Sequence, residues 1–153
     1  MANEVTDPQH ESAGAWAKKY YLASRLVMES VLRPHDLGPT QWYVLYHLAT
    51  VGEIPQRDLA ALLQVERATL TGVVAALVRK GLLVQEPSRT DQRQKMLRLT
   101  PAGAALWPKL PDPIALILGT AFDGIAASEV ETTVHVLRTA TGKLHDLLSK
   151  GTP

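Results

Sequence analysis

Positive charge is concentrated in one stretch of the sequence, from Arg79 to Arg98. Six lysine or arginine side chains lie there against two acidic ones, Glu86 and Asp91. Residues 53–100 hold eight basic and five acidic residues, a balance of +3, so a chain of net charge +1 carries −2 elsewhere. A local surplus of this kind on a hairpin-like segment is typical of a surface that contacts a polyanion such as nucleic acid.

Two short helices are predicted just before and within this basic stretch. The first follows Pro55 and turns Leu59, Leu62 and Leu63 inward. The second covers ERATLTGVVAALVRK and ends at Gly81, because glycine readily adopts the backbone conformation that stops a helix. Two short helices joined by a tight turn form a helix-turn-helix, whose second helix reads DNA.

Two strand-like runs follow the second helix. They are LLVQE (82–86) and KMLRL (95–99), and they flank the turn-rich segment PSRTDQRQ. A helix-turn-helix followed by a β-hairpin is a winged helix. The expected fold class is therefore mainly α with a small β wing, a winged helix-turn-helix with helices on both sides.

Amphipathic helices are predicted before and after this lobe. One spans 15–32, and a second opens at Pro39. Thr100-Pro101 starts another, with the threonine as N-cap and the proline at the first helical position. Three prolines then interrupt the helix: Pro108, Pro111 and Pro113.

The last helix is predicted to begin at a capping box, Ser128–Glu131, and to run to about Lys150. Its apolar positions are Val130, Val134, Leu137, Leu144 and Leu148. A winged helix closes its core without such terminal helices, so their apolar faces need a partner, and a second copy of the chain is the simplest one. We therefore expect a homodimer, with a tail and first dimerisation helix over 1–36, a DNA-binding lobe over 37–100 and dimerisation helices over 101–153 in one compact chain.

Several short motifs occur in a characteristic order. They are Leu37-Gly-Pro-Thr-Gln-Trp42, Asp58-Leu-Ala60, Arg67-Ala-Thr-Leu-Thr71, Arg79-Lys-Gly-Leu82, Asp91-x-Arg93 and Leu99-Thr-Pro-Ala-Gly103. Together they make the chain resemble the MarR family of bacterial transcriptional regulators over nearly its whole length. The resemblance implies a helical dimer with one winged helix-turn-helix per subunit that binds pseudo-palindromic operators, mostly as a repressor. It also implies release of DNA when a small, often aromatic or phenolic, molecule enters between the dimer helices and the DNA-binding lobe.

Two positions depart from the family pattern. Pro55-Gln56 stands where Thr-Gln is usual, and Glu66 stands where a serine is common. A carboxylate at Glu66 accepts a hydrogen bond from a cytosine amino group or repels phosphate. The departure bears on the operator sequence and not on DNA binding itself.

Candidate DNA contacts lie on the second helix and on the wing. Arg93 at the wing tip is expected in the minor groove, and the resemblance implies that Asp91 pairs with an arginine and orients the wing. In the first turns of the reading helix the candidates are Glu66, Arg67, Thr69, Leu70 and Thr71, with Leu70 open to a core role instead. Arg79, Lys80, Arg89, Lys95 and Arg98 either contact phosphates or are simply solvated.

Aromatic residues gather in the two helices before the basic stretch. Five side chains form a candidate site for a small aromatic effector: Trp16, Tyr20, Arg25, Tyr43 and His47. Packing within the core or a dimer interface is the alternative explanation, and it is the favoured one for Trp42 and Tyr46.

Other classes of protein find little support in the sequence. The chain has no cysteine, its histidines are scattered, and it contains no nucleophile elbow, phosphate loop or metal motif. We therefore expect no enzyme, no cofactor and no metal site. The polar, acidic N-terminus is unlike a signal peptide, and the longest apolar run, Ile114–Leu118, is too short for a membrane. The expected protein is a soluble, cytoplasmic, ligand-responsive repressor that binds double-stranded DNA. The alternative is a winged-helix protein-interaction module without ligand sensing.

Overall fold

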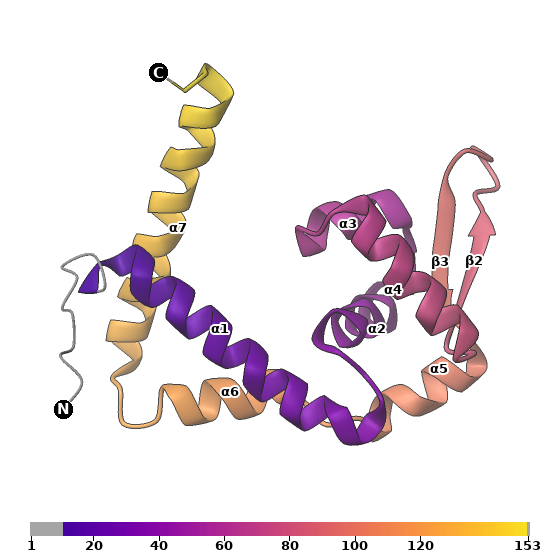
Figure 1. The fold of residues 1–153 in the computed structure, drawn as a ribbon, viewed down its shortest axis with the longest axis horizontal. Helices are drawn as coiled ribbons and strands as arrows, with labels where there is room; N and C mark the ends of the chain where they lie inside the picture. Colours follow the sequence, from indigo (N-terminus) through magenta and orange to yellow (C-terminus); the bar gives the residue numbers. More distant parts are fainter. Residues whose placement is uncertain (1–10, 153) are drawn as a thin grey trace, which may run out of the picture. The chain divides into compact units, whose positions relative to one another are not determined.

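The computed structural model describes residues 11–152, and it is mainly helical with one small antiparallel sheet (Figure 1). In chain order, its elements are α1 (Ala13–Leu32), η2 (Arg33–His35), α2 (Pro39–Val51), β1 (Glu53–Pro55), α3 (Gln56–Leu63), α4 (Arg67–Arg79), β2 (Leu83–Pro87), β3 (Lys95–Leu99), α5 (Pro101–Leu106), η3 (Trp107–Lys109), α6 (Pro113–Ala121) and α7 (Ala127–Lys150). The fold class expected from the sequence, mainly α with a β wing, is confirmed.

The chain divides into two compact units, Met1–Pro113 and Ile114–Pro153. The first unit therefore contains α1 together with the winged helix-turn-helix and α5. The boundaries predicted at residues 36 and 100 separate dimerisation segments from the DNA-binding lobe. They describe function and not compactness, and they stay a prediction. No single helix among residues 11–152 is long and apolar enough to cross a membrane, and only α3 and α4 taken together, across a bend of 115°, meet that test.

Helices α3 and α4, which are bent by 115° relative to each other, form the helix-turn-helix. Gln64 makes the turn possible by adopting a left-handed conformation, with φ of 53°. Leu59 of α3 and Leu70 of α4 are both fully buried and hold the two helices to one core. The prediction that Leu62 turns inward is wrong, since 54% of its surface is exposed.

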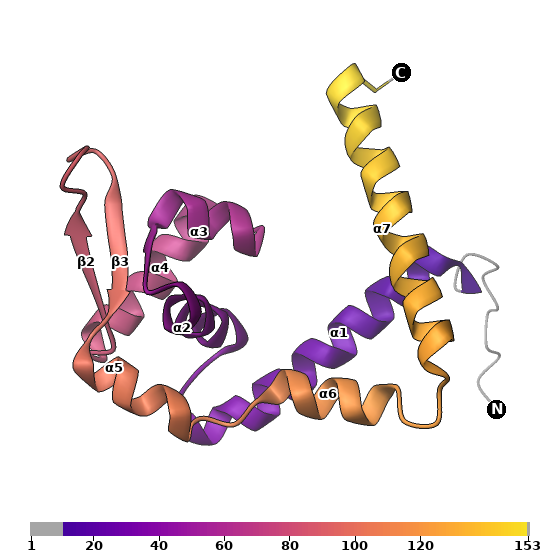
Figure 2. The same ribbon diagram turned by 180° about the vertical axis from the view of Figure 1, so that it is seen from behind.

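The sheet has the strand order β1-β3-β2, and both pairings are antiparallel. Leu97 in the central strand lies opposite Ile54 on one side and Gln85 on the other, and it is fully buried. Strands β2 and β3 were predicted, whereas β1 was not. Figures 1 and 2 show the β2–β3 hairpin beside α3 and α4, with its loop at the outer end; we call this hairpin and its loop, residues 83–99, the wing.

The Leu99-Thr-Pro-Ala-Gly103 motif joins the base of the wing to α5. Thr100 caps α5 as predicted, because its hydroxyl accepts the Gly103 N–H (3.0 Å) and donates to the Gly81 carbonyl (2.6 Å). A Cβ at position 103 would lie 2.1 Å from the carbonyl oxygen of Leu82. Only glycine therefore allows α5 to approach the wing this closely.

An aromatic cluster ties the segment after α5 to α2. The Trp42 ring stacks on Tyr46 and meets Trp107, each with a centroid separation of 5.4 Å. The Trp42 indole N–H donates to the carbonyl of Pro111 at 3.3 Å. Trp42 is 2% exposed, which agrees with its assignment to the core. Trp107 begins η3, and a non-helical segment precedes Pro113, so the three prolines interrupt the helix as predicted.

The beginning of α7 differs from the prediction. The helix starts at Ala127 with Ala126 as N-cap, and no side chain caps it. Ser128 therefore lies inside the first turn, so the predicted capping box is wrong. The helix does end at Lys150, as expected.

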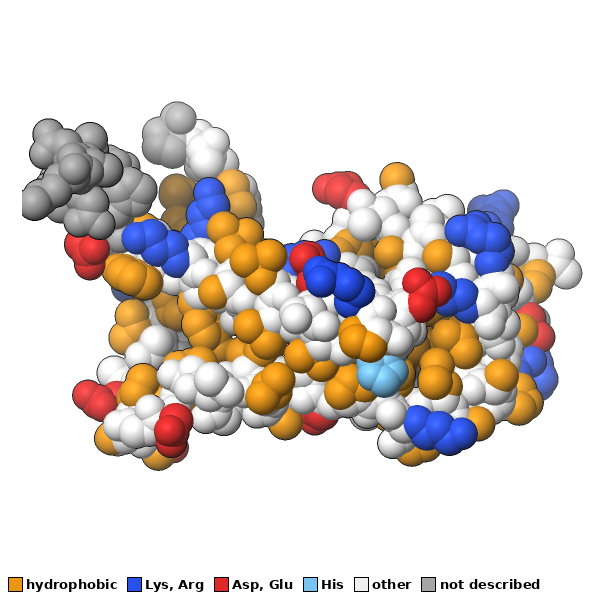
Figure 3. Space-filling model, turned by 60° about the horizontal axis from the view of Figure 1, so that its bottom comes forward, with side chains coloured by type: hydrophobic (Ala, Val, Ile, Leu, Met, Phe, Trp, Pro, Cys, Tyr) orange, Lys and Arg blue, Asp and Glu red, His pale blue; other side chains and the backbone are white. Residues whose placement is uncertain are grey.

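Large apolar side chains remain exposed on α1 and on α7. On α7 no residue is buried, and the exposed apolar residues are Val134, Val136, Leu137, Leu144, Leu147 and Leu148. On α1 they are Trp16, Tyr20, Tyr21, Leu22, Leu26 and Val27. Figure 3 shows hydrophobic side chains over much of one face of the molecule.

Candidate nucleic-acid interface

An open groove of about 610 Å³ lies between α3, the beginning of α4 and the wing. We call it the reading groove. Its lining residues are Pro55, Gln56, Arg57, Ala60, Arg67, Leu70, Thr71, Asp91, Arg93, Gln94 and Lys95. Four of these carry positive charge and one carries negative charge. The structure therefore brings together Arg67, Thr71, Asp91, Arg93 and Lys95, five of the residues that the sequence analysis singled out.

The first two turns of α4 present a mixed surface. Arg67, Thr69 and Thr71 are exposed, as side chains that contact base edges must be. Leu70 is fully buried in the core. The inclusion of Leu70 among the DNA contacts is therefore wrong, because this side chain lines the groove without exposing any of its surface.

Glu66 is the N-cap residue of α4, and its side chain is exposed and makes no capping hydrogen bond. Its carboxylate sits at the positive end of the helix dipole, which partly offsets its charge. The carboxylate is therefore free to face whatever approaches the start of α4, and its role toward cytosine or phosphate stays a prediction.

Local hydrogen bonds hold the tip of the wing. The Asp91 carboxylate accepts the backbone N–H of Arg93 at 3.0 Å, and the Gln94 N–H donates to the Asp91 carbonyl at 3.0 Å. The hydroxyl of Ser88, a residue only 9% exposed, accepts the N–H groups of Thr90 and Asp91. Asp91 thus shapes the turn that presents Arg93 through the backbone. The expected pairing of Asp91 with an arginine side chain is not found among residues 11–152.

Cations on this face differ in whether they have a partner. Within the described part of the chain, Arg67, Arg89, Arg93 and Lys95 are exposed and form no ion pair. Arg98 pairs with Glu86 across the wing at 2.9 Å. On the wing, Arg89, Arg93 and Lys95 are therefore more available to bind an anion than Arg98 is.

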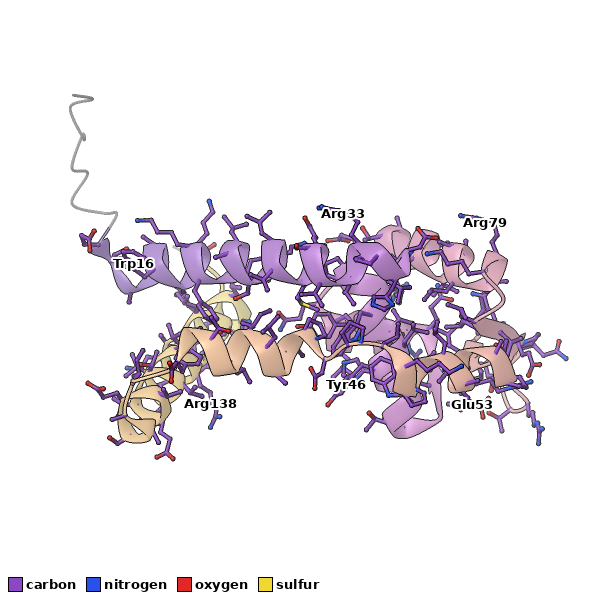
Figure 4. All side chains as sticks on the ribbon, turned by 90° about the horizontal axis from the view of Figure 1, so that it is seen from below. Trp16, Arg33, Tyr46, Glu53, Arg79 and Arg138 are labelled. Carbon is purple, nitrogen blue, oxygen red and sulfur yellow. The ribbon has the colours of Figure 1, made fainter. Side chains whose placement is uncertain are left out.

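Lys80 and Arg79 lie at the far end of α4. The ammonium group of Lys80 donates to the Asp36 carbonyl and to the Gln41 side chain (3.2 Å), and it lies 3.5 Å from the Asp36 carboxylate. These contacts tie the end of α4 to Asp36 and to Gln41 of α2, and the phosphate contact of Lys80 stays a prediction. Arg79 extends on the side where Arg33 also extends (Figure 4), and it does not line the reading groove.

Five residues that line the groove were not among the predicted DNA contacts: Pro55, Gln56, Arg57, Ala60 and Gln94. Arg57 lies one residue into α3 and forms an ion pair with Asp58 at 3.5 Å. The signal for Arg57 was available, because the start of the first helix of a helix-turn-helix lies near the DNA backbone. Gln56 and Gln94 gave no signal of their own, since their positions depend on the packing of the wing.

The candidate effector residues fall into separate groups. Tyr43 of α2 interacts electrostatically with Tyr20, Tyr21 and Arg25 of α1. Burial raises the pKa of the Tyr43 phenol above its usual value of 10.0, Tyr21 raises it further, and Arg25 opposes the shift. A partly buried phenol beside a guanidinium can bind a polar aromatic molecule. Tyr21 was not among the predicted residues.

Trp16 and His47 have other neighbours. The Trp16 indole N–H donates to the Glu11 carboxylate at 3.1 Å, and Lys19 lies 4.3 Å from the Trp16 ring. The His47 ring meets Tyr46 edge-on at 5.1 Å. Among residues 11–152, no three histidine or acidic side chains are grouped closely enough to hold a metal ion.

The fold and this basic groove define the class of protein. A helix-turn-helix whose second helix begins beside an arginine-tipped wing is a winged helix-turn-helix, an architecture that places its second helix against duplex DNA.

Comparisons with known proteins agree with this class. Residues 35–94 match the model of the MarR family. The transcriptional activatory protein BadR of Rhodopseudomonas palustris is 32% identical over 142 residues, which cover 88% of this chain and 81% of BadR. Among solved structures, BpsR of Bordetella bronchiseptica has a TM-score of 0.76 at 24% identity, with 86% of this chain and 94% of BpsR covered. A mutant MarR of E. coli complexed with operator DNA has a TM-score of 0.76 at 23% identity, with 88% and 99% covered.

The chain therefore belongs to the MarR family, and it is a transcriptional regulator of that family. The resemblance noted from its sequence motifs is confirmed.

Proposed function

We propose that two copies of this chain bind one pseudo-palindromic DNA duplex and thereby control transcription. In each copy, α4 enters the major groove and the wing places Arg93 in the neighbouring minor groove. The reading groove carries this proposal, because it is lined by Arg57, Arg67, Arg93 and Lys95 and by a single carboxylate, Asp91. Convergent cations beside an exposed helix start are what binding to a phosphate backbone requires.

The state of that single carboxylate supports the assignment. Asp91 accepts a backbone N–H from Arg93, so its charge is partly satisfied within the turn. Arg93 itself has no anionic partner within residues 11–152. An unpaired guanidinium on a shaped hairpin tip suits the strongly negative minor groove.

The uncovered apolar faces support a homodimer. A 24-residue helix with no buried residue, α7, is unusual unless something covers it. A second copy supplies the same apolar face and needs no further component. A two-fold dimer then carries two reading helices, which fit successive major grooves when the half-sites are one helical turn apart.

The group around Tyr43 supports an aromatic effector. Tyr20, Tyr21 and Arg25 interact electrostatically with this phenol, and the structurally similar BpsR is described as regulated in its DNA binding by 6-hydroxynicotinic acid. An effector that fits only one spacing of the reading helices shifts the population of dimers toward or away from the DNA-binding form. We propose that small aromatic acids or phenols act here.

The direction of control depends on the operator. Repression is the expectation from the sequence motifs, whereas the relative BadR is named an activatory protein. A dimer bound over a promoter blocks transcription, and one bound upstream can assist it. A reporter placed under the selected operator, with and without the regulator, decides between the two outcomes.

The proposal is tested by selecting duplexes from a random library with the purified chain. We expect a pseudo-palindromic site bound by a dimer. If each subunit contacts about three phosphates, log affinity should fall with log salt at a slope of about −5. Adding benzoate-like acids or phenols to the selected complex tests the effector. Enrichment of no sequence at low salt would overturn DNA recognition.

A further inference from the structure

Three side chains and one backbone carbonyl form a chain of hydrogen bonds from the wing to α4, the reading helix. Gln85 of β2 donates to the side-chain oxygen of Gln56, at the start of α3. Gln56 donates to the Thr71 hydroxyl at 3.5 Å, and Thr71 donates to the Arg67 carbonyl at 2.9 Å. Each donor points toward Arg67, so the chain of bonds has one direction.

This arrangement uses the only proton of the Thr71 hydroxyl. A threonine hydroxyl has a single donor hydrogen. In Thr71 that hydrogen goes to the Arg67 carbonyl, and the oxygen also accepts from Gln56. To donate to a phosphate or a base, the hydroxyl would have to give up its bond to the Arg67 carbonyl. The methyl group is the remaining part of this exposed, groove-lining side chain.

Thr69 gives a direct contrast two residues earlier. It is exposed on the same helix, and its hydroxyl has no hydrogen-bond partner within residues 11–152. Its hydroxyl can therefore donate to a phosphate oxygen. The two threonines are chemically identical but differ in what they can offer DNA.

We propose that Thr71 reads DNA through its methyl group, by apolar contact with the C5-methyl of a thymine, and that Gln56 is the positioning residue that holds it there. This rests on the proposed function, in which α4 enters the major groove. Thymine is the base that displays a methyl group in that groove, and threonine methyl is one of its apolar partners. Gln85 extends the same restraint to the wing, so the wing and the reading helix are held in one register.

The test compares thymine with deoxyuridine, which lacks the methyl group, in the selected duplex. Thymines are replaced one position at a time, in both half-sites together. The wild-type chain should lose about fourfold in affinity per half-site at one position, the amount expected for one buried methyl group. Thr71→Val, which keeps the methyl and lacks the hydroxyl, should show the same loss there. Thr71→Ser should bind both duplexes equally.

Three further variants separate recognition from folding. Thr69→Val should bind more weakly to both duplexes, with the deoxyuridine factor unchanged. Thr50→Val is the matched control, because the Thr50 hydroxyl donates to the Tyr46 carbonyl (2.8 Å) on a helix outside the reading groove, and DNA binding should not change. Gln56→Met should reduce the deoxyuridine factor while thermal unfolding stays close to wild type, since the bonds it loses are solvent-exposed.

The inference is overturned if no thymine position responds to deoxyuridine, or if Thr71→Ser keeps the full response. It is also overturned if Thr71→Val alone abolishes binding, because the hydroxyl would then make the contact. Failure to select any duplex would overturn the proposed function and this inference with it. A selected duplex that is indifferent to every deoxyuridine overturns this inference alone.

Discussion

Leu70 of α4 and Leu144 of α7 are both leucines of amphipathic helices, yet Leu70 is fully buried and Leu144 is 61% exposed. The first lies in a lobe where α2, α3, α4 and the sheet surround one core. The second lies on a helix with no buried residue. The winged lobe therefore buries its own hydrophobic residues, whereas those of α7 stay exposed within residues 11–152, as the proposed dimer requires.

The largest expected effect comes from the exposed face of α7. In Leu144→Asp combined with Leu148→Asp, a dimer would bury four aspartates in place of leucines. Burial of one leucine stabilises by about 1.5–3 kcal/mol, so the dimer should lose on the order of 6 kcal/mol or more. Sedimentation should show monomers, and operator affinity should fall by more than about a hundredfold.

The lobe should still unfold cooperatively in this variant, because none of its core residues is changed. Thr139→Asp is the control, since helical periodicity places residue 139 opposite Leu137 on α7. A double variant that remains dimeric would show that α7 is not the dimer interface, and the comparison between the two regions would fail.

The next effect concerns the core of the lobe. Leu70→Ala should reduce the free energy of unfolding by about 2–5 kcal/mol, because it removes a fully buried side chain and leaves a cavity. Leu62→Ala in α3, where the side chain is 54% exposed, should change it by less than about 0.5 kcal/mol. Denaturant unfolding of the two variants measures the difference. Equal losses would contradict the assignment of Leu70 to the core.

These two leucines also show how far the sequence carries. Helix periods, Gly81 and Thr100-Pro101 are local signals, and they located α4, the wing and α5 correctly. The same local pattern could not tell that Leu62 faces solvent, since α3 is a short helix packed on one side only. The Ser128–Glu131 motif failed for a related reason: helix formation extends back to Ala127, which places the serine inside the first turn.

Other features depend on residues distant in sequence. Strand β1 has three residues and no pattern of its own, and it exists because Ile54 pairs with Leu97. Nothing in the sequence indicates that Asp36 lies beside Lys80, which is 44 residues further along the chain. Likewise, nothing in the sequence connects Gln85 with Gln56 or Gln56 with Thr71. The residue types on the reading face could be predicted from the sequence. The sequence could not show which of their polar groups already form hydrogen bonds within the protein.

The third effect separates two arginines of the wing. Arg93→Ala should weaken operator binding by about tenfold per half-site, and it should make the salt dependence shallower, because a cation in the minor groove is lost. Arg98→Ala should cost less than about twofold, since this guanidinium is already paired with Glu86 at 2.9 Å. Binding isotherms at several salt concentrations give both quantities. Equal effects would mean that ion pairing within the wing does not decide which cations contact DNA.

The smallest effect lies where α2 meets α1, at Tyr43. Burial, with a contribution from Tyr21, raises the pKa of this phenol above 10.0, so the folded chain keeps the proton that the unfolded chain releases as the pH rises. Stability from this group is complete below pH 10 and is lost above it, as the pH approaches the raised pKa of the folded state.

Tyr43→Phe should leave stability at neutral pH nearly unchanged and make its decline above pH 10 less steep. Absorbance titration of tyrosinate should show one late-ionising tyrosine in the wild type that is missing in the variant. If no tyrosine ionises late, Tyr43 is open to solvent, and this part of α2 would not belong to the self-sufficient lobe.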